Sequence, residues 1–308
     1  METKHVLTMV RKHKILFLFV AVFLTAVQAW TQAAPQPDAK AHRLLMWKAT
    51  SPTNTVYLLG SIHAGDKEFY PLPDVVESAF NNSKLLVVEV NVKNVNPMAG
   101  MKLVQQYGVY PENDALSKHL SRATADALDA YCSKHGLPRA LLEKFKPWMA
   151  ALTIEVMAVQ QAGEDLQMGI DLHFLNESKE PQKIEELETA DFQMTALSSG
   201  SEEEQQEFLA QTLKHAENTK ERLGSMRKAF LNGDADTIEK MLEEDNEPKS
   251  LYKRLVDDRN GPMAERIAAY LNGKDQCFVV VGAGHLVGEK GIIRQLRDKN
   301  FKVEQMSR

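Results

Sequence analysis

Two apolar runs near opposite ends of the chain end in the same short motif, and this feature most constrains the fold. The first is "VYLLGSIHAG", Val56 to Gly65, and the second is "CFVVVGAGHLVG", Cys277 to Gly288. Each run has the length of a strand and is followed by Gly-x-x-His. Near-continuous apolar runs are typical of strands buried on both faces by helices. The sequence therefore predicts a sheet that takes strands from both ends of the chain.

The segments between these runs predict two more strands and a large amount of helix. "SKLLVVEVN" at 83–91 is an apolar run of strand length, and "PQKIEELET" at 181–189 alternates weakly. Helical patterns with N-cap, proline or glycine signals lie at 71–83, 121–138, 146–163 and 201–272. We expect an α/β fold with a small parallel or mixed sheet core formed by both ends of the mature chain. A large helical insertion occupies about residues 97–272.

The first 29 residues have the three parts of a secretory signal peptide. Four Lys or Arg residues precede the apolar run at 15–27, and small residues of the A-x-A type follow it. The apolar run is about 13 residues long, short of the roughly 18 that cross a bilayer as a helix. We expect residues 1–29 to be removed, 30–42 to be a flexible mature N-terminus, and 43–308 to form a single domain. The protein would then be exported, to the periplasm or outside the cell, with an uncleaved inner-membrane anchor as the alternative.

The charge of the chain argues against one class of partner. The formal net charge is -5, and it falls to about -8 without residues 1–29, which carry four Lys or Arg and one Glu. Nucleic-acid binding needs a basic stripe, and the sequence supplies none. We therefore expect no nucleic-acid partner and no nucleotide cofactor. A membrane contact is expected only through an uncleaved N-terminal segment, and the oligomeric state stays open.

The two cysteines, Cys132 and Cys277, do not fix the fold. An even number of cysteines in an exported chain permits a disulfide. Cys277 opens an apolar strand and Cys132 lies in a helical pattern, so two buried free thiols are an equal alternative.

Side chains able to do chemistry follow the strands at the ends where ligands collect in α/β sheets. His63 and His285 follow the two glycine-ended runs, and Glu89 interrupts "LLVVEVN", where an unpaired carboxylate is costly to bury. Two imidazoles and a carboxylate can bind a divalent metal such as Mn, Co or Zn, or activate water directly. These three residues are therefore candidates both for metal ligands and for catalysis. The alternative is that each histidine only bonds a loop carbonyl.

Arg259 is the fourth candidate for the catalytic site. It lies at the start of a helical pattern just before the last apolar run, within reach of the same crevice. Its guanidinium group suits a substrate carboxylate, a developing oxyanion, or Glu89 itself. Glu188, at the end of the weak strand, and Asp171, in "GIDLHF", are further candidates, and Asp171 equally suits the cap of the helix it starts.

Six segments together resemble the TraB/GumN family, whose animal relatives are the Tiki proteases. They are "YLLGSIHAGDKEFYPLP", "LLVVEVN", "KPWMAAL", "MGIDLHFL", "LVDDRNGPMAERI" and "FVVVGAGHLVGEKGI". The resemblance covers residues 43–304 and implies a fold shared with the erythromycin esterase and ChaN-like proteins. It also implies a site made by His63, Glu89, Arg259 and His285.

The resemblance leaves the reaction open. The Tiki branch is described as Mn- or Co-dependent peptidases, and the esterase branch as histidine-driven hydrolases that need no metal. We expect an exported hydrolase that acts on a peptide or a small ester or amide, as a metal-dependent peptidase or amide/ester hydrolase. The alternatives are a metal-independent histidine-base esterase and a non-catalytic periplasmic binding protein for a peptide, a metal or haem. Since the C-terminal anchor of the animal proteins is not expected here, a Tiki-type substrate is not transferred.

Overall fold

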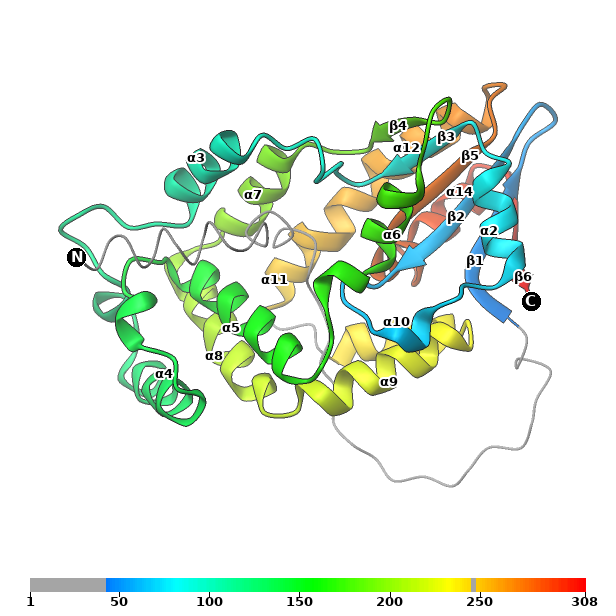
Figure 1. Cartoon of the computed structure of the whole chain (residues 1–308). Coiled ribbons are helices and arrows are strands. Elements are labelled where there is room, and N and C mark those ends of the chain that lie inside the picture. The colour runs from blue at the N-terminus through cyan, green and yellow to red at the C-terminus, as the bar shows by residue number, and fades with distance from the viewer. Residues whose placement is uncertain (1–42, 245–247) are drawn as a thin grey trace.

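The computed structural model describes residues 43–244 and 248–308, and these residues form a six-stranded mixed sheet covered by helices (Figure 1). The predicted signal peptide and the mature N-terminal segment 30–42 lie outside the described residues. In the described part of the chain, no helix combines the length and the apolar character needed to span a membrane. The predicted α/β class is confirmed, with strands from both ends of the chain in one sheet.

The sheet has the strand order β4-β3-β5-β2-β1-β6. β4, β3, β5 and β2 are parallel to one another. β1 pairs antiparallel with β2 on one side and with β6 on the other. Their bounds are β1 Arg43–Thr50, β2 Thr55–Ser61, β3 Leu85–Val88, β4 Lys183–Glu186, β5 Cys277–Gly282 and β6 Lys302–Ser307. The runs at 56–61, 83–91, 181–189 and 277–282 were predicted as strands, while β1 and β6 were not. These two make the sheet mixed.

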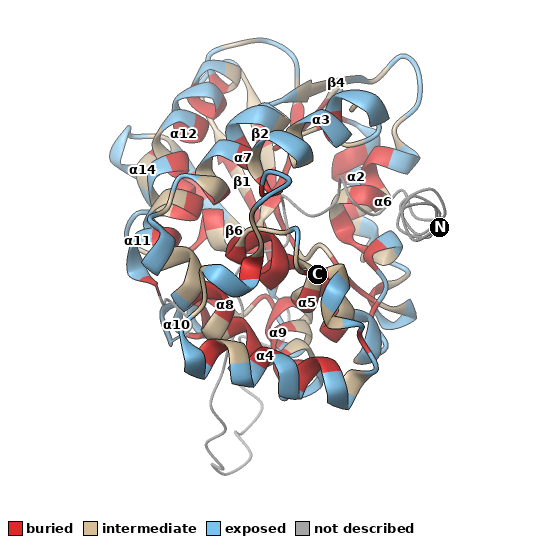
Figure 2. Cartoon of the chain, turned by 90° about the vertical axis from the view of Figure 1, so that its left-hand side faces the viewer, coloured by how far each residue is buried: buried red, intermediate tan, exposed pale blue. Residues whose placement is uncertain are grey.

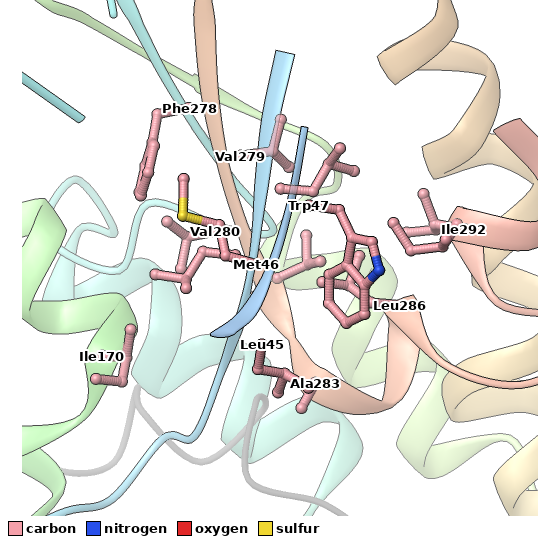
Figure 3. Packing of buried hydrophobic residues seen from close by; sticks show 14 of the residues in the cluster. Leu45, Met46, Trp47, Ile170, Phe278, Val279, Val280, Ala283, Leu286 and Ile292 are labelled. Atoms are coloured by element: carbon pink, nitrogen blue, oxygen red, sulfur yellow. The ribbon is translucent and has the colours of Figure 1, made fainter. Parts of the chain in front are cut away.

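β5 is the central parallel strand, and side chains bury it on both faces. Phe278 and Val280 lie on one side of the sheet together with Ile170, and Val279 lies on the other together with Trp47 (Figure 3). Residues 277–281 are almost wholly inaccessible to solvent. This two-sided burial is the physical reason that the sequence of β5 is apolar throughout instead of alternating.

Local sequence signals mark both ends of α4, Arg122–His135. The side chain of Ser121 accepts a bond from the N–H of Thr124, and Gly136 ends the same helix with φ 65°, a left-handed conformation that suits glycine. The long helices are α2 Asp74–Asn81, α3 Pro97–Tyr107, α4 Arg122–His135, α5 Pro147–Gln161, α6 Ile170–Glu177, α7 Ala190–Ser198, α8 Glu202–Ala216, α9 Thr219–Leu231, α10 Ala235–Glu244 and α12 Asp258–Leu271. Shorter ones are α11 Lys249–Tyr252, α13 Ala283–Leu286 and α14 Ile292–Asp298.

Two hydrophobic clusters hold the described residues together. One surrounds the sheet, and the other fills the space among α4, α5, α7 and α8. These helices lie to one side of the sheet in Figure 1, and their exposed faces point outward in Figure 2. Cys132 belongs to the helical cluster and Cys277 to the sheet cluster, and both are buried free thiols. The disulfide alternative is therefore wrong.

Candidate functional site

The carboxyl ends of the four parallel strands bring the sequence-predicted residues to one edge of the sheet. His63 lies two residues beyond β2, Glu89 directly follows β3, and His285 lies in α13 just beyond β5. The N–H of Glu188 donates to the carbonyl of Glu89 at 2.9 Å, so the pairing of β4 with β3 continues to this point. The parallel strands therefore end with the side chains of His63, Glu89 and His285 at one edge of the sheet. Glu188 lies at the same edge.

Gly282, the last residue of β5, faces the point where these groups meet. A β-carbon built on Gly282 would lie 3.3 Å from Oε1 of Glu89, 3.6 Å from Nε2 of His63 and 3.6 Å from Cδ2 of His285. We call the space next to Gly282 between these three side chains the Gly282 cradle. The structure thus brings together the three residues that the sequence offered as metal ligands.

Glu89 is buried, and both of its carboxylate oxygens accept hydrogen bonds. Its Oε1 accepts from the N–H of Gly282 at 2.7 Å, and its Oε2 accepts from Nη2 of Arg259 at 2.6 Å and Nε2 of Gln193 at 3.1 Å. Burial alone would raise the pKa of Glu89, but the nearby His285 and Arg259 and the Gly282 N–H lower this pKa to about 2. Since the guanidinium is the permanent cation of this group, it keeps the carboxylate ionised.

Arg259 lies between two carboxylates at the start of α12. Its Nη2 and Nε donate to Glu188 at 2.6 and 3.0 Å, its Nη2 also donates to Glu89, and its Nη1 donates to the carbonyl of Leu255 at 2.6 Å. The side chain is only 6% exposed. Of the three partners left open by the sequence, the structure places Arg259 on Glu89. Glu188 is a further partner of Arg259. Burial raises the pKa of Glu188, although Arg259 opposes this shift.

His63 is held by a carboxylate. Its Nδ1 lies 2.6 Å from Oδ2 of Asp171, and Oδ1 of Asp171 accepts from Oγ of Ser61 at 2.6 Å. Burial lowers the pKa of His63, but the charge and the hydrogen bond of Asp171 outweigh burial, so the pKa is raised overall. Asp171 lies in the first turn of α6 and makes no cap there, because Gly169 is the N-cap residue and carries no side-chain bond.

A close backbone contact fixes the position of Asp171 relative to His63. The N–H of Ile170 donates to the carbonyl of Ile62 at 3.0 Å, which ties the start of α6 to the segment that carries His63. A β-carbon on Gly169 would lie only 2.4 Å from the carbonyl oxygen of His63, so only glycine permits this approach. The local sequence "MGID" therefore sets the distance between the two side chains.

His285 is held by a neutral side chain. Its Nδ1 lies 2.7 Å from Oδ1 of Asn260, and its Nε2 lies 3.6 Å from Oε1 of Glu89. Burial lowers the pKa of His285 to about 4 even though Glu89 opposes this shift. The imidazole is therefore neutral near pH 7. Both histidines bond side chains at Nδ1 and not the loop carbonyls of the structural alternative.

The chemistry of the site suits a divalent cation. Among residues 43–244 and 248–308, no group of three or more His, Cys, Asp or Glu side chains is arranged so that it could hold a metal ion. The cradle does offer two imidazoles and one carboxylate oxygen, a donor set that Mn, Co and Zn accept. Three acidic side chains, Glu89, Glu188 and Asp171, lie around the single guanidinium of Arg259, so acidic groups predominate near the cradle. The donor types of His63, Glu89 and His285 fit such a cation, whereas their arrangement in the described structure does not form a metal site.

Two residues of the site were not singled out from the sequence. Gln193, on α7, is 3% exposed and donates from Nε2 to both Glu89 and Glu188. Ser61 ends β2 and bonds Asp171. A polar residue inside the apolar stretch before His63 was a signal for Ser61, but Gln193 lies in an ordinary helical pattern and had none.

Comparison with known proteins identifies the family of the chain. The model of the TraB/PrgY/gumN family matches residues 45–305. The chain is 27% identical to "Uncharacterized protein YbaP" of Escherichia coli (strain K12) over 243 residues, which cover 78% of this chain and 87% of that protein. It is 22% identical to an "Uncharacterized protein" of Treponema pallidum (strain Nichols) over 298 residues, covering 92% and 89%.

The names of these relatives state no activity, and no solved structure matches the chain. The family model nevertheless covers nearly all of the described residues and contains every residue of the Gly282 cradle. The chain therefore belongs to the TraB/PrgY/gumN family.

Proposed function

We propose that the protein is a hydrolase that cleaves a peptide, amide or ester bond at the Gly282 cradle, with a divalent cation held by His63, Glu89 and His285. The observation that carries this proposal is the convergence of these three side chains on one point beside Gly282. The predominance of acidic groups around this point supports a cation as the occupant.

A divalent cation in such a site supplies two effects, a lower pKa for bound water and a polarised carbonyl oxygen. Residues of the protein hold the proposed ligand Glu89 in the required state. Arg259, Gln193 and the N–H of Gly282 hold the carboxylate of Glu89 ionised and aimed at the cradle. Arg259 is thus a positioning residue in this proposal, because its donors are engaged with Glu89, Glu188 and the backbone.

A metal-independent mechanism is the second candidate, and one contact favours it. The 2.6 Å contact between Nδ1 of His63 and Asp171 is the arrangement that orients a general base. In this mechanism Nε2 of His63 takes a proton from a water molecule whose oxygen attacks the carbonyl carbon of the substrate. The same nitrogen then returns the proton to the leaving amine or alkoxide, while Asp171 holds the ring in place.

Export is part of the proposal. The basic, apolar and small-residue regions of positions 1–29 support transport across one membrane, into the periplasm or out of the cell. A peptide or a small ester or amide in that compartment is the substrate class. The acidic charge of the mature chain supports the expectation that nucleic acid is not a partner.

The proposal is tested by metal content and turnover measured on the same preparations. The protein is purified without chelator, and its metal is quantified by mass spectrometry alongside the variants His63→Ala, Glu89→Ala and His285→Ala. Each variant should lose the metal and the hydrolysis of a peptide and ester library. His119→Ala is the matched control, because His119 packs on Tyr110 outside the cradle and should keep both.

Three outcomes would contradict the metal-dependent hydrolase in different ways. Wild-type turnover in excess chelator, without bound metal, would replace it with the histidine-base mechanism. Metal binding without turnover of any library member would favour a binding protein for a peptide, a metal or haem. Loss of metal in the His119 variant as well would show that the measured metal is not bound at the cradle.

A further inference from the structure

Two different side chains hold the two histidines of the Gly282 cradle by the same ring atom. Oδ2 of Asp171 lies 2.6 Å from Nδ1 of His63, and Oδ1 of Asn260 lies 2.7 Å from Nδ1 of His285. One partner is an anion and the other a neutral amide. Each ring is therefore bonded at Nδ1, and Nε2 is its remaining nitrogen.

The proton position on His63 follows from the chemistry of its partner. An ionised carboxylate only accepts hydrogen bonds, so Nδ1 of His63 must be the donor in its contact with Asp171. The other oxygen of Asp171 is satisfied by Oγ of Ser61 at 2.6 Å. In neutral His63 the unprotonated nitrogen is then Nε2, the atom 3.6 Å from the β-carbon position of Gly282.

The proton position on His285 is set by a backbone carbonyl two contacts away. Nδ2 of Asn260 donates to the carbonyl of Lys290 at 3.0 Å. A carbonyl only accepts, so the NH₂ group of Asn260 must face Lys290 and its oxygen must face His285. Asn260 is 1% exposed, which leaves no room for the amide to turn toward solvent. Nδ1 of His285 is therefore the donor, and Nε2 carries the lone pair.

The lone pair of His285 then faces another acceptor. Nε2 lies 3.6 Å from Oε1 of Glu89, which is longer than a hydrogen bond. Two acceptors that face each other without a hydrogen between them repel. The repulsion is relieved when a cation, or a water molecule that donates to both, lies between them. The arrangement is consistent with an occupant that accepts electron pairs.

We propose that Asp171 and Asn260 are positioning residues that fix both histidines as the Nδ1–H tautomer, so that the lone pair of each ring lies on Nε2, which faces the Gly282 cradle in His63 and Oε1 of Glu89 in His285. The consequence for metal binding rests on the proposed function, but the tautomers themselves do not. Partners that orient a ligating histidine typically contribute about 10- to 100-fold in metal affinity. Neither residue touches the cradle, so each acts only through the ring that it holds.

The tautomers are measured directly, on metal-free protein, by two-bond ¹⁵N–¹H correlation of the imidazole rings. The measurement is made at an alkaline pH at which the ¹⁵N chemical shifts show both rings to be neutral. Wild-type His63 and His285 should each show a protonated Nδ1 and an unprotonated Nε2. The variants His63→Gln and His285→Gln assign the signals, because each removes one set. A protonated Nε2 on either wild-type ring would overturn the proposal for that ring.

Two variants of Asn260 separate positioning from a merely structural role. Asn260→Leu and Asn260→Asp both lose the bond to the Lys290 carbonyl, so a structural role predicts the same result for both. Only Asn260→Leu removes the acceptor at Nδ1. It should move the proton of His285 to Nε2, the nitrogen on the side of the Glu89 carboxylate, whereas Asn260→Asp should keep the wild-type tautomer. A wild-type tautomer in both variants, with melting curves that show folded protein, would refute the role of Asn260.

Metal affinity gives the second readout, with Zn²⁺ alone as the probe. Asn260→Leu should bind Zn²⁺ about 10- to 100-fold more weakly than wild type, and Asn260→Asp should bind it within a few-fold. Equal Zn²⁺ affinity in Asn260→Leu despite an altered tautomer would refute the link from tautomer to binding. If wild type shows the expected tautomers but binds no metal, the positioning role stands and the metal-dependent function fails.

Discussion

Placing one methyl group in the Gly282 cradle should separate function from folding. In Gly282→Ala the new β-carbon would lie 3.3 Å from Oε1 of Glu89 and 3.6 Å from both Nε2 of His63 and Cδ2 of His285. The backbone of residue 282 has φ -50° and ψ 138°, which alanine adopts without strain. The substitution therefore acts on the occupant of the cradle and not on the backbone.

The expected change in stability is small, and the expected change in activity is large. Loss of unfolded-state entropy should stabilise Gly282→Ala by about 0.4–1 kcal/mol, and the tight contact with Glu89 should offset a similar amount. The free energy of unfolding should thus stay within about 1 kcal/mol of wild type. Because the methyl group would take the place of the proposed occupant, kcat/KM should fall by a factor on the order of 100, or roughly 2.7 kcal/mol.

The assay combines urea unfolding, metal content and kcat/KM on the same samples. Gly224→Ala is the matched control, since its β-carbon would meet nothing within 4 Å inside α9. It should gain up to about 1 kcal/mol of stability and keep full activity. A Gly282→Ala protein that keeps both metal and turnover would refute the cradle as the site. A loss of several kcal/mol in the free energy of unfolding of Gly282→Ala would refute the geometry around Gly282.

Three further predictions address the ion pairs, the pH response and export. Arg259→Leu leaves Glu89 and Glu188 buried without their guanidinium, so urea unfolding should show a loss of about 3–5 kcal/mol, and a loss below about 1 kcal/mol would contradict the buried pair. The pKa of Glu89 lies near 2 in the folded protein and near 4.5 ordinarily, so its contribution is complete above about pH 4.5 and is lost as the pH falls toward 2. The stability difference between wild type and Glu89→Gln should therefore shrink by about 3 kcal/mol between pH 7 and pH 2, and a constant difference would exclude this linkage. N-terminal sequencing of the processed protein should begin between Trp30 and Gln36, whereas an intact original N-terminus would favour the anchor.

The strands that could be predicted are those whose residues are apolar because the strand is buried. β2, β3 and β5 are apolar because helices cover both faces of the sheet around them. β1 has four consecutive buried residues, a run too short to distinguish a strand from a helix by periodicity. β6 buries only Val303 fully, so its sequence carries little signal, and its pairing with β1 makes it a strand.

The same distinction applies to the site. His63, Glu89 and His285 could be proposed together because each follows a strand, and parallel strands end at one edge. Gln193 could not, since its burial depends on how α7 folds over Glu188. For Asp171 the sequence left capping as an alternative, and only the close approach of two backbone segments selects its contact with His63.

The position of β5 in the sheet has a consequence for how the chain folds. β5 lies between β3 and β2, so without it the pair β4-β3 is separated from the strands on the other side. Val56 must find Cys277, and Thr50 must find Lys302, at sequence distances that make loop closure costly and folding slow compared with the helical bundle. A chain emerging from its N-terminus can complete its helical cluster early, but the edges of β3, β2 and β1 that pair with β5 and β6 stay open until its last segment arrives. His285 follows β5 and is the last residue of the cradle to be synthesised, so a partly synthesised chain exposes unpaired strands and lacks a complete cradle.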